Sequence, residues 1–216
     1  PIVTKESKMH IEPGYVASAK ILAANAAAIA LIGSQSVHLL KAPLQIVRSL
    51  LAAVFFTVAM QAFHLPVGPS ELHFLGAMPL YLSLGFIPTL FGFAMGLLIQ
   101  GLVFDPSDLV HLGVNFLSLA LPLVLVHATF GRHPGALSVG SIMKRDAAYY
   151  AGVTLMVGLW LAIAELATPF SAWLAFATAY APIVVIETVI TRVLLQTLDR
   201  SQGSTLLRHS LQPGSR

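Results

Sequence analysis

The sequence predicts an all-α protein: a polytopic transmembrane bundle of about seven helices, with the N-terminus outside and the C-terminus inside. Two features of the composition indicate the membrane. Of the 216 residues 56% are hydrophobic and only 10% are charged, whereas a soluble domain carries about 25% charged residues. In addition, several apolar runs reach the roughly 20 residues that cross a bilayer. The N-terminus shows no signal-peptide pattern, so we expect the first apolar run to remain in the mature protein.

Charge and cysteine content exclude several classes of function. The net charge is +3, and the Lys and Arg residues are scattered, so the dense basic face of a nucleic-acid-binding protein is missing. The chain contains no cysteine, which leaves nitrogen and oxygen atoms as the ligands for any metal. No ATP-binding or catalytic motif is present, so we expect a protein that is not an enzyme and does not hydrolyse ATP by itself.

Six apolar runs predict the membrane spans, and one of them is too long for a single crossing. The runs cover residues 16–33, 44–63, 72–104, 109–129, 147–167 and 174–197. The third would extend about 50 Å as one helix, at 1.5 Å per residue, against a hydrocarbon core about 30 Å thick. Gly85 and Pro88 in its middle predict a break, with a short helix ending near residue 84 and a longer one beginning near residue 86.

Basic residues predict the orientation of the bundle. They fall between the first two spans, before the 147–167 span and at the C-terminal end: Lys41 and Arg48; Arg132, Lys144 and Arg145; Arg192, Arg200 and Arg208. The positive-inside rule places all three groups in the cytoplasm, which requires two crossings between residues 72 and 104. We therefore predict a membrane domain over residues 9–198, an N-terminal extension over residues 1–8 and a disordered cytoplasmic tail over residues 199–216.

Most potential metal ligands fall on the predicted outer side. They are His10, His64, Glu71, His73, Asp105, Asp108, His111 and Glu165, whereas His38 and His133 fall inside. Histidine is the commonest metal-ligating side chain, and neutral imidazole suits nickel, cobalt, copper and zinc. His73 stands out because it lies where the chain re-enters the membrane, and irregular backbone there is tolerated when it packs in protein or lines a cavity.

The stretch MHIEPG, residues 9–14, offers a second part of a metal site. A histidine second from a free N-terminus can bind through its amine, its deprotonated amide and its imidazole, a planar nitrogen set that suits Ni(II), Cu(II) or low-spin Co(II). One further imidazole completes four ligands. Glu12 either holds a hydrogen bond that orients a ligand or is an ordinary exposed acid.

Four other features each leave two interpretations open. Asp105, Asp108 and His111 form either a carboxylate-rich vestibule or a helix start, with Ser107 or Asp108 as the N-cap. Asn115 either braces a loop or bonds a neighbouring helix. The alanines at four-residue spacing (Ala23 and Ala27, Ala24 and Ala28, Ala26 and Ala30) favour close helix packing, within this chain or with a separate membrane subunit. Glu187, inside the last span, is a functional candidate with Arg192 and Thr188 as ordinary partners.

Three ordered signatures support a family resemblance. They are Met9, His10, Ile11 and Gly14; then His73, Gly76, Gly85, Gln100, Leu112, Gly113 and Asn115; then Pro182 and Glu187. Over roughly residues 9–198 the chain resembles the CbiM/NikM group, the cobalt- or nickel-specific membrane subunits of energy-coupling-factor (ECF) ABC transporters. In this group the loop before the short helix usually reads Ser-His-Pro-Thr-Gly, whereas this chain reads SELHFLGA and keeps only the His and the Gly.

The resemblance implies a seven-helix fold that binds Co(II) or Ni(II) as transported substrate, without an organic cofactor. The implied ligands are the amine of Met9, the amide and imidazole of His10, and His73. Since eight residues precede Met9, its amine is free only in a chain that begins there. The implied partners are a membrane scaffold (T) subunit, cytoplasmic ATPase subunits and the lipid bilayer of a bacterial cytoplasmic (inner) membrane.

Two other functions remain as alternatives. The chain could be a non-transporting integral-membrane packing subunit of a larger complex, with its extended N-terminus docked on a neighbour. It could also be a stand-alone permease, which ranks last because only Glu187 and a few amides and hydroxyls could line a polar path.

Overall fold

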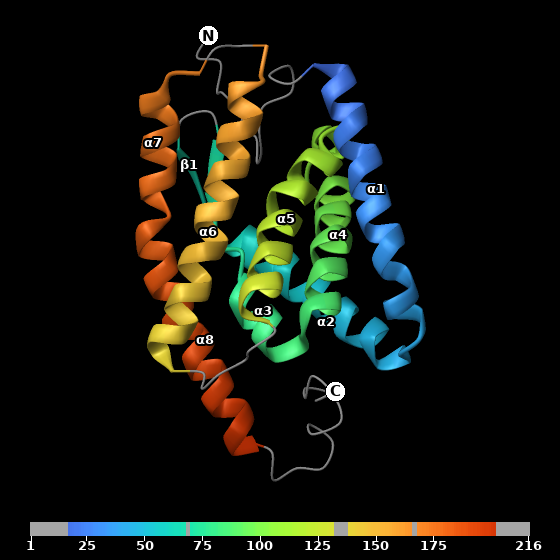
Figure 1. Ribbon diagram of the computed structural model, residues 1–216, viewed down its shortest axis with the longest axis vertical. Helices are drawn as coiled ribbons and strands as arrows, with labels where there is room; N and C mark the ends of the chain where they lie inside the picture. The colour runs from blue at the N-terminus through green and yellow to red at the C-terminus, as the bar shows by residue number, and fades with distance from the viewer. Residues whose placement is uncertain (1–16, 68–69, 132–137, 166–167, 202–216) are drawn as a thin grey trace.

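The chain folds into long helices that lie side by side, with a short β-hairpin against one side (Figure 1). The computed structural model describes residues 17–67, 70–131, 138–165 and 168–201. The helices are α1 (Ser18–Leu40), α2 (Pro43–Ala62), α3 (Ala77–Leu84), α4 (Phe86–Val103), α5 (Leu112–Phe130), α6 (Val139–Ala162), α7 (Phe170–Ala179) and α8 (Ala181–Ser201). A 3-10 turn, η1 (Pro106–Leu109), and the strands β1 (His64–Val67) and β2 (Ser70–His73) complete the fold. The all-α prediction is therefore confirmed.

The α-helices in the described residues correspond to the seven predicted helices when α7 and α8, which only Tyr180 separates, are taken as one. By length and composition, five spans there could cross a membrane: α1, α2, α4, α5 and α7–α8 together. α6 has 24 residues, but Lys144, Arg145 and Asp146 near its start lower its hydropathy. α3 has eight residues, about 12 Å of helix, which is too short to cross.

Two helices are longer than predicted. α1 continues to Leu40 instead of ending near residue 33, and the hydroxyls of Ser34 and Ser36 find partners within it by donating to carbonyls one turn earlier, each at 2.7 Å. α6 begins at Val139 instead of residue 147, with the Ser138 side chain capping the Ser141 amide. Lys144 and Arg145, predicted in a loop, therefore lie in α6.

The predicted break between the third and fourth helices is at Gly85. Its backbone angles are φ 98° and ψ 173°, a region open essentially to glycine alone. The Gly85 amide ends α3 by donating to the Tyr81 carbonyl, and the Gly85 carbonyl begins α4 by accepting from the Thr89 amide. One residue thus ends one helix and starts the next.

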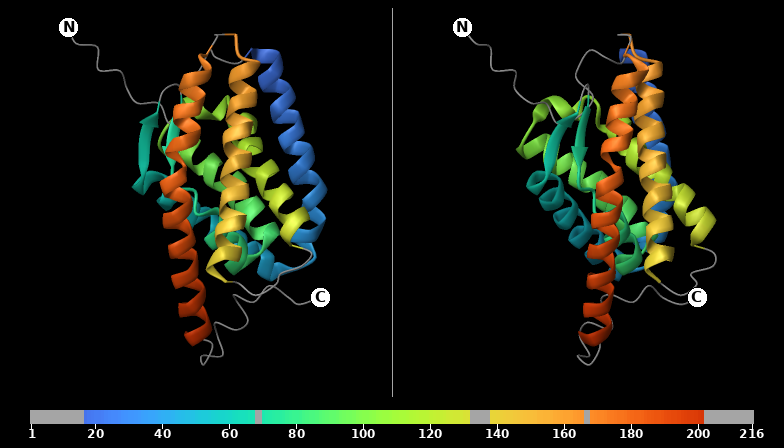
Figure 2. Two further views of the ribbon diagram at one scale, coloured as in Figure 1. Left: turned by 60° about the vertical axis from the view of Figure 1, so that its left-hand side comes forward. Right: turned by 90° about the vertical axis from the view of Figure 1, so that its left-hand side faces the viewer.

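The hairpin was not predicted. β1 and β2 are antiparallel, with His64 opposite His73, and both strands lie beside α7 in two directions of view (Figure 2). The prediction that a helix starts at residue 72 is wrong, since α3 begins at Ala77. The N–H and C=O groups of the two strands hydrogen-bond to each other, whereas a membrane would offer them no partners.

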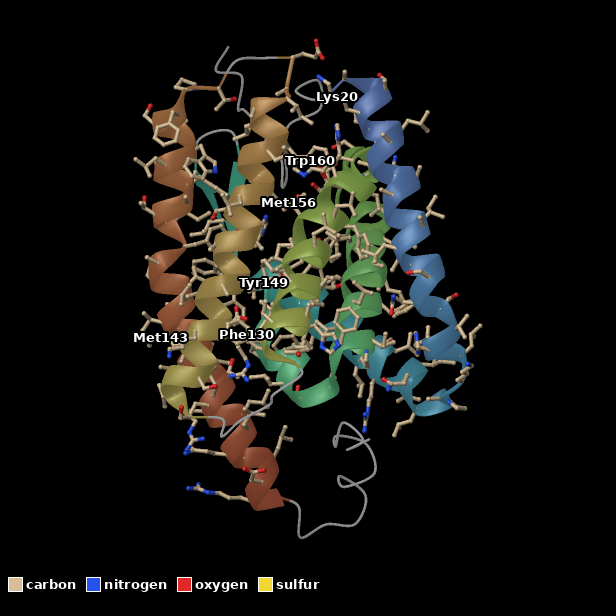
Figure 3. All side chains as sticks on the ribbon, viewed as in Figure 1. Lys20, Phe130, Met143, Tyr149, Met156 and Trp160 are labelled. Atoms are coloured by element: carbon tan, nitrogen blue, oxygen red, sulfur yellow. The ribbon has the colours of Figure 1, made fainter. Side chains whose placement is uncertain are left out.

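Side-chain contacts fix which connections share an end of the bundle. Lys20, at the start of α1, pairs with Glu165 beyond the end of α6 at 3.0 Å. Asn25 of α1 accepts from the Gly113 amide at 2.7 Å, which brings the α4–α5 connection to the same end. At the opposite end, the Tyr81 hydroxyl lies 3.0 Å from Nδ1 of His127. Figure 3 shows Lys20 and Trp160 toward the first end, and Phe130 and Met143 toward the second. Which end faces outward stays a prediction.

The alanines of α1 divide between two faces. Ala24 and Ala28 are buried, which supports packing within the chain, whereas Ala23, Ala26, Ala27 and Ala30 are exposed. The close approach depends on Gly113 of α5, where a Cβ atom would lie 2.4 Å from the Asn25 amide oxygen.

Candidate metal site

His73 is the predicted metal ligand that the structure describes, and it lies inside the protein. It is the last residue of β2 and is only 4% exposed. Tyr180, the residue between α7 and α8, lies close to the backbone of His73 at the end of the hairpin. Only seven residues, the last four of them in α3, separate His73 from Tyr81 at the opposite end. His73 thus lies within the bundle.

A buried carboxyl group holds the chain immediately after His73. Glu187 of α8 is 0% exposed, and its Oε1 atom accepts from the Met78 amide at 2.9 Å. The backbone of Gly76 and Ala77 lies close to the Glu187 side chain. The Tyr150 hydroxyl of α6 donates to Oε2 of Glu187. Glu187 therefore connects α8 and α6 to the start of α3.

The predicted partner Thr188 does not bond Glu187. Its hydroxyl instead donates to Oδ2 of Asp146 at 2.7 Å, and both residues are 0% exposed. The carboxyl group of Asp146 lies near that of Glu187, and its Oδ1 atom has no hydrogen-bond partner among the described residues. α6 and α8 are thus joined by two adjacent polar contacts inside an apolar bundle.

Aromatic rings enclose these polar contacts. The Tyr150 ring lies 4.9 Å from Tyr180 and 5.5 Å from Tyr149, measured between centroids, and Phe176 packs against Tyr180 at 5.3 Å. Tyr149 lies between the two ends of the bundle in Figure 3. Because the rings exclude water, each hydrogen bond they enclose is costly to leave unmade.

Sequence reasoning missed Tyr150, Tyr180 and Asp146. A signal was available for two of them, since an acid and a pair of tyrosines follow one another closely in an otherwise apolar helix. Tyr180 carries no comparable signal, because an isolated tyrosine in a membrane helix is equally typical of simple packing.

In the α4–α5 connection a side chain caps a helical turn, as predicted, but it belongs to a different residue. Asp105, instead of Ser107 or Asp108, is the cap: its carboxylate accepts from the Ser107 amide at 3.0 Å and from the Ser107 hydroxyl at 2.6 Å. Asp108 and His111 are nevertheless buried.

Two amides of the family signature are also buried. Gln100 is 0% exposed and Asn115 is 7% exposed. Among the residues that the structure describes, neither polar atom of the Gln100 amide has a hydrogen-bond partner. Whether Asn115 orients a metal ligand stays a prediction.

The complete ligand set is not contained in the described part of the chain. Within residues 17–67, 70–131, 138–165 and 168–201, no three His, Asp or Glu side chains come together as a metal site. Met9, His10 and Glu12 lie outside these residues, as do the 1–8 extension and most of the predicted tail. His73 can supply one neutral imidazole nitrogen, and the contribution of Met9 and His10 to a metal site stays a prediction.

Comparison with known proteins identifies the family. The model of the cobalt uptake substrate-specific transmembrane region, CbiM, matches residues 10–204. A solved crystal structure described as that of a transition metal transporter aligns with a TM-score of 0.71 and 19% sequence identity, covering 92% of this chain and 96% of that chain. A search of curated proteins found no match. The structural match establishes a shared fold, and the family-model match over nearly the whole chain shows that the chain belongs to the CbiM family of cobalt uptake transmembrane components.

Proposed function

We propose that this chain is the substrate-binding membrane subunit of an ECF transporter that takes up Co²⁺ or Ni²⁺. Membership of the CbiM family supports a membrane component for metal uptake. The proposal adds the two candidate ions, a bacterial cytoplasmic membrane, a membrane scaffold subunit and cytoplasmic ATPase subunits. The energy for transport would come from those partners, since the chain carries no ATP-binding motif.

The observation that carries the proposal is the position of His73. An imidazole at 4% exposure, on a segment that enters the bundle, can bind a cation only where other ligands replace its hydration shell. We propose the amine of Met9 and the amide and imidazole of His10 as those ligands. Four nitrogen donors of this kind form the planar set that Ni(II) and low-spin Co(II) favour.

The proposed mechanism has two steps. The ion is captured from the predicted outer side and bound at His73, at the end of the hairpin. A tilting or loop-opening movement, driven by the ATPase subunits, then releases it inward. This division of roles assigns binding and selectivity to this chain and energy conversion to its partners.

Isothermal titration of the purified protein in detergent with NiCl₂ or CoCl₂ tests the proposal. We compare the full chain with a chain that begins at Met9, because only the second has a free amine next to His10. The expected result is binding of one ion per protein in the second form. His73→Ala should then lower the affinity by more than the 10–100-fold typical of losing a ligand's supporting hydrogen bond.

A matched control is His38→Ala, which removes an exposed histidine at the far end of α1. It should leave affinity and stoichiometry unchanged. If His73→Ala binds the ion as the unaltered protein does, His73 is not a ligand and the proposed site is wrong. If neither chain form binds either ion, the result supports the alternative of a non-transporting packing subunit.

A further inference from the structure

We infer that Glu187, Tyr150 and Tyr180 form a clamp that positions His73 for metal binding, with Glu187 as its principal positioning residue. We call these three side chains the α6–α8 clamp. The inference rests on the proposed function for its metal-binding consequence. The geometry of the clamp itself does not depend on a metal.

The clamp contacts the backbone at two points between His73 and the start of α3. The Leu75 amide donates to the Tyr150 hydroxyl at 3.4 Å, and the Met78 amide donates to Oε1 of Glu187 at 2.9 Å. Tyr180 lies close to the backbone of His73, and its ring packs against the Tyr150 ring at 4.9 Å. All three clamp residues come from α6, α8 or the residue between α7 and α8, so one side of the bundle holds the whole segment.

The start of α3 needs a hydrogen-bond acceptor from outside the helix. The first amides of a helix have no partner inside it, and the N-cap of α3 is Gly76, which has no side chain to supply one. A buried helix start without partners would cost about 1–3 kcal/mol for each unsatisfied amide. Glu187 supplies the missing acceptor from another helix, so the cap and the inter-helix contact are a single interaction.

A carboxyl group suits position 187 better than an amide. Oε1 faces backbone donors and Oε2 faces the Tyr150 hydroxyl, so both oxygens accept. A glutamine of the same size offers one accepting oxygen and one donating NH₂ group. One of these two contacts would then have to be lost or reversed.

The segment between His73 and α3 is also held from the opposite side, by α2. Gly76 has φ +62°, and the place where a Cβ atom would stand lies 2.4 Å from Cε1 of Phe55 on α2. The chain therefore passes between Phe55 and the clamp with little freedom. Since His73 is three residues from Gly76, the clamp limits where its imidazole can lie.

The test uses Glu187→Gln, with Thr191→Val as the matched control. Thr191 is on the same helix, is 0% exposed and donates to the Glu187 backbone carbonyl at 2.7 Å, a hydrogen bond that stays within α8. Both variants replace a buried polar group by one of equal size. Thermal unfolding and size-exclusion chromatography in detergent establish that each variant is folded.

Two measurements then follow on the chain that begins at Met9. The first is Ni²⁺ titration with the visible spectrum of the bound ion. In Glu187→Gln we expect affinity to fall about 10–100-fold, the range for losing a supporting contact of a ligand, with a spectrum that shifts away from four nitrogen donors. Thr191→Val should keep wild-type affinity and spectrum. A loss of stability alone does not change the ligand field of the ion that remains bound.

The second measurement needs no metal: the rate at which diethylpyrocarbonate modifies His73 in the metal-free full chain, followed by mass spectrometry. We expect slow modification in the wild type and in Thr191→Val, and faster modification in Glu187→Gln. Equal rates in all three proteins overturn the clamp, whatever the metal results. If the wild type binds no Ni²⁺ but Glu187→Gln exposes His73, the clamp is supported and the proposed metal function fails.

Discussion

Gly76→Ala is the substitution for which the structure gives the clearest expectation. Gly76 lies between His73 and α3 with φ +62° and ψ 31°, the left-handed region that residues with a Cβ atom avoid. The new methyl group would also stand 2.4 Å from Cε1 of Phe55, whereas carbon atoms in contact are about 3.5–4.0 Å apart. Both effects act on the segment that carries His73.

The two effects give the expected magnitude. The left-handed conformation costs alanine about 1–2 kcal/mol, and an overpacked contact typically costs about 1–3 kcal/mol. Phe55 is 37% exposed, so its ring can move partly aside, which favours the lower half of the second range. We expect a total loss of about 2–4 kcal/mol, or a fall in Tm of roughly 5–15 °C for a chain of this size.

The assay is thermal unfolding of the purified protein in detergent, with Gly33→Ala as the control. Gly33 lies within α1, and a Cβ atom there meets nothing within 4 Å. Alanine is favoured over glycine in a helix by up to about 1 kcal/mol, so this variant should melt at or slightly above the wild-type temperature. The two variants add the same methyl group and differ only in where it stands.

A third protein separates the two causes. In Phe55→Ala the ring that the methyl group meets is gone, so adding Gly76→Ala to it should cost only the backbone part, about 1–2 kcal/mol. The reasoning is refuted if Gly76→Ala melts within a degree of Gly33→Ala, or if removing the ring leaves its full cost unchanged.

Two further substitutions test the fold in the same thermal assay. Gly85→Ala, at φ 98° and ψ 173°, should cost about 1–3 kcal/mol or more; a wild-type Tm would contradict the break at this residue. Asn25→Ala removes the acceptor of the Gly113 amide at 2.7 Å, so we expect a loss of stability of about 1–3 kcal/mol. The control Ser34→Ala changes a residue on the same helix that hydrogen-bonds only to its neighbours in α1, and it should cost less. Equal losses for Asn25→Ala and Ser34→Ala would mean that the α1–α5 contact adds no stability.

The break at Gly85 could be predicted because two independent patterns required it. An apolar run too long for one crossing needs an interruption, and the distribution of basic residues needs an additional crossing. Gly85 and Pro88 are the residues that permit the interruption. Length, charge and backbone preference are all local properties of the sequence, so they can be read without the fold.

The hairpin and the clamp could not be predicted in this way. HLPVGPSELH has no run of alternating apolar and polar residues long enough to indicate strands, and its pairing becomes favourable only inside the bundle. Glu187 was recognised as functional because it is an acid in a span, but its true partners are far from it in sequence: Tyr150 lies 37 positions away and Met78 lies 109 positions away. Such contacts depend on which helices become neighbours.

The clamp and the candidate metal site satisfy one physical requirement. An imidazole that binds an ion within the bundle must be carried there by backbone that is neither helix nor continuous strand, and its amides need partners where no bulk water is present. For the Leu75 and Met78 amides those partners are Tyr150 and Glu187. Side chains that give these backbone amides hydrogen-bond partners must also hold the segment in one place. A ligand on irregular backbone at this depth can therefore be as well positioned as one on a helix, and in this chain α6 and α8 supply the rigidity.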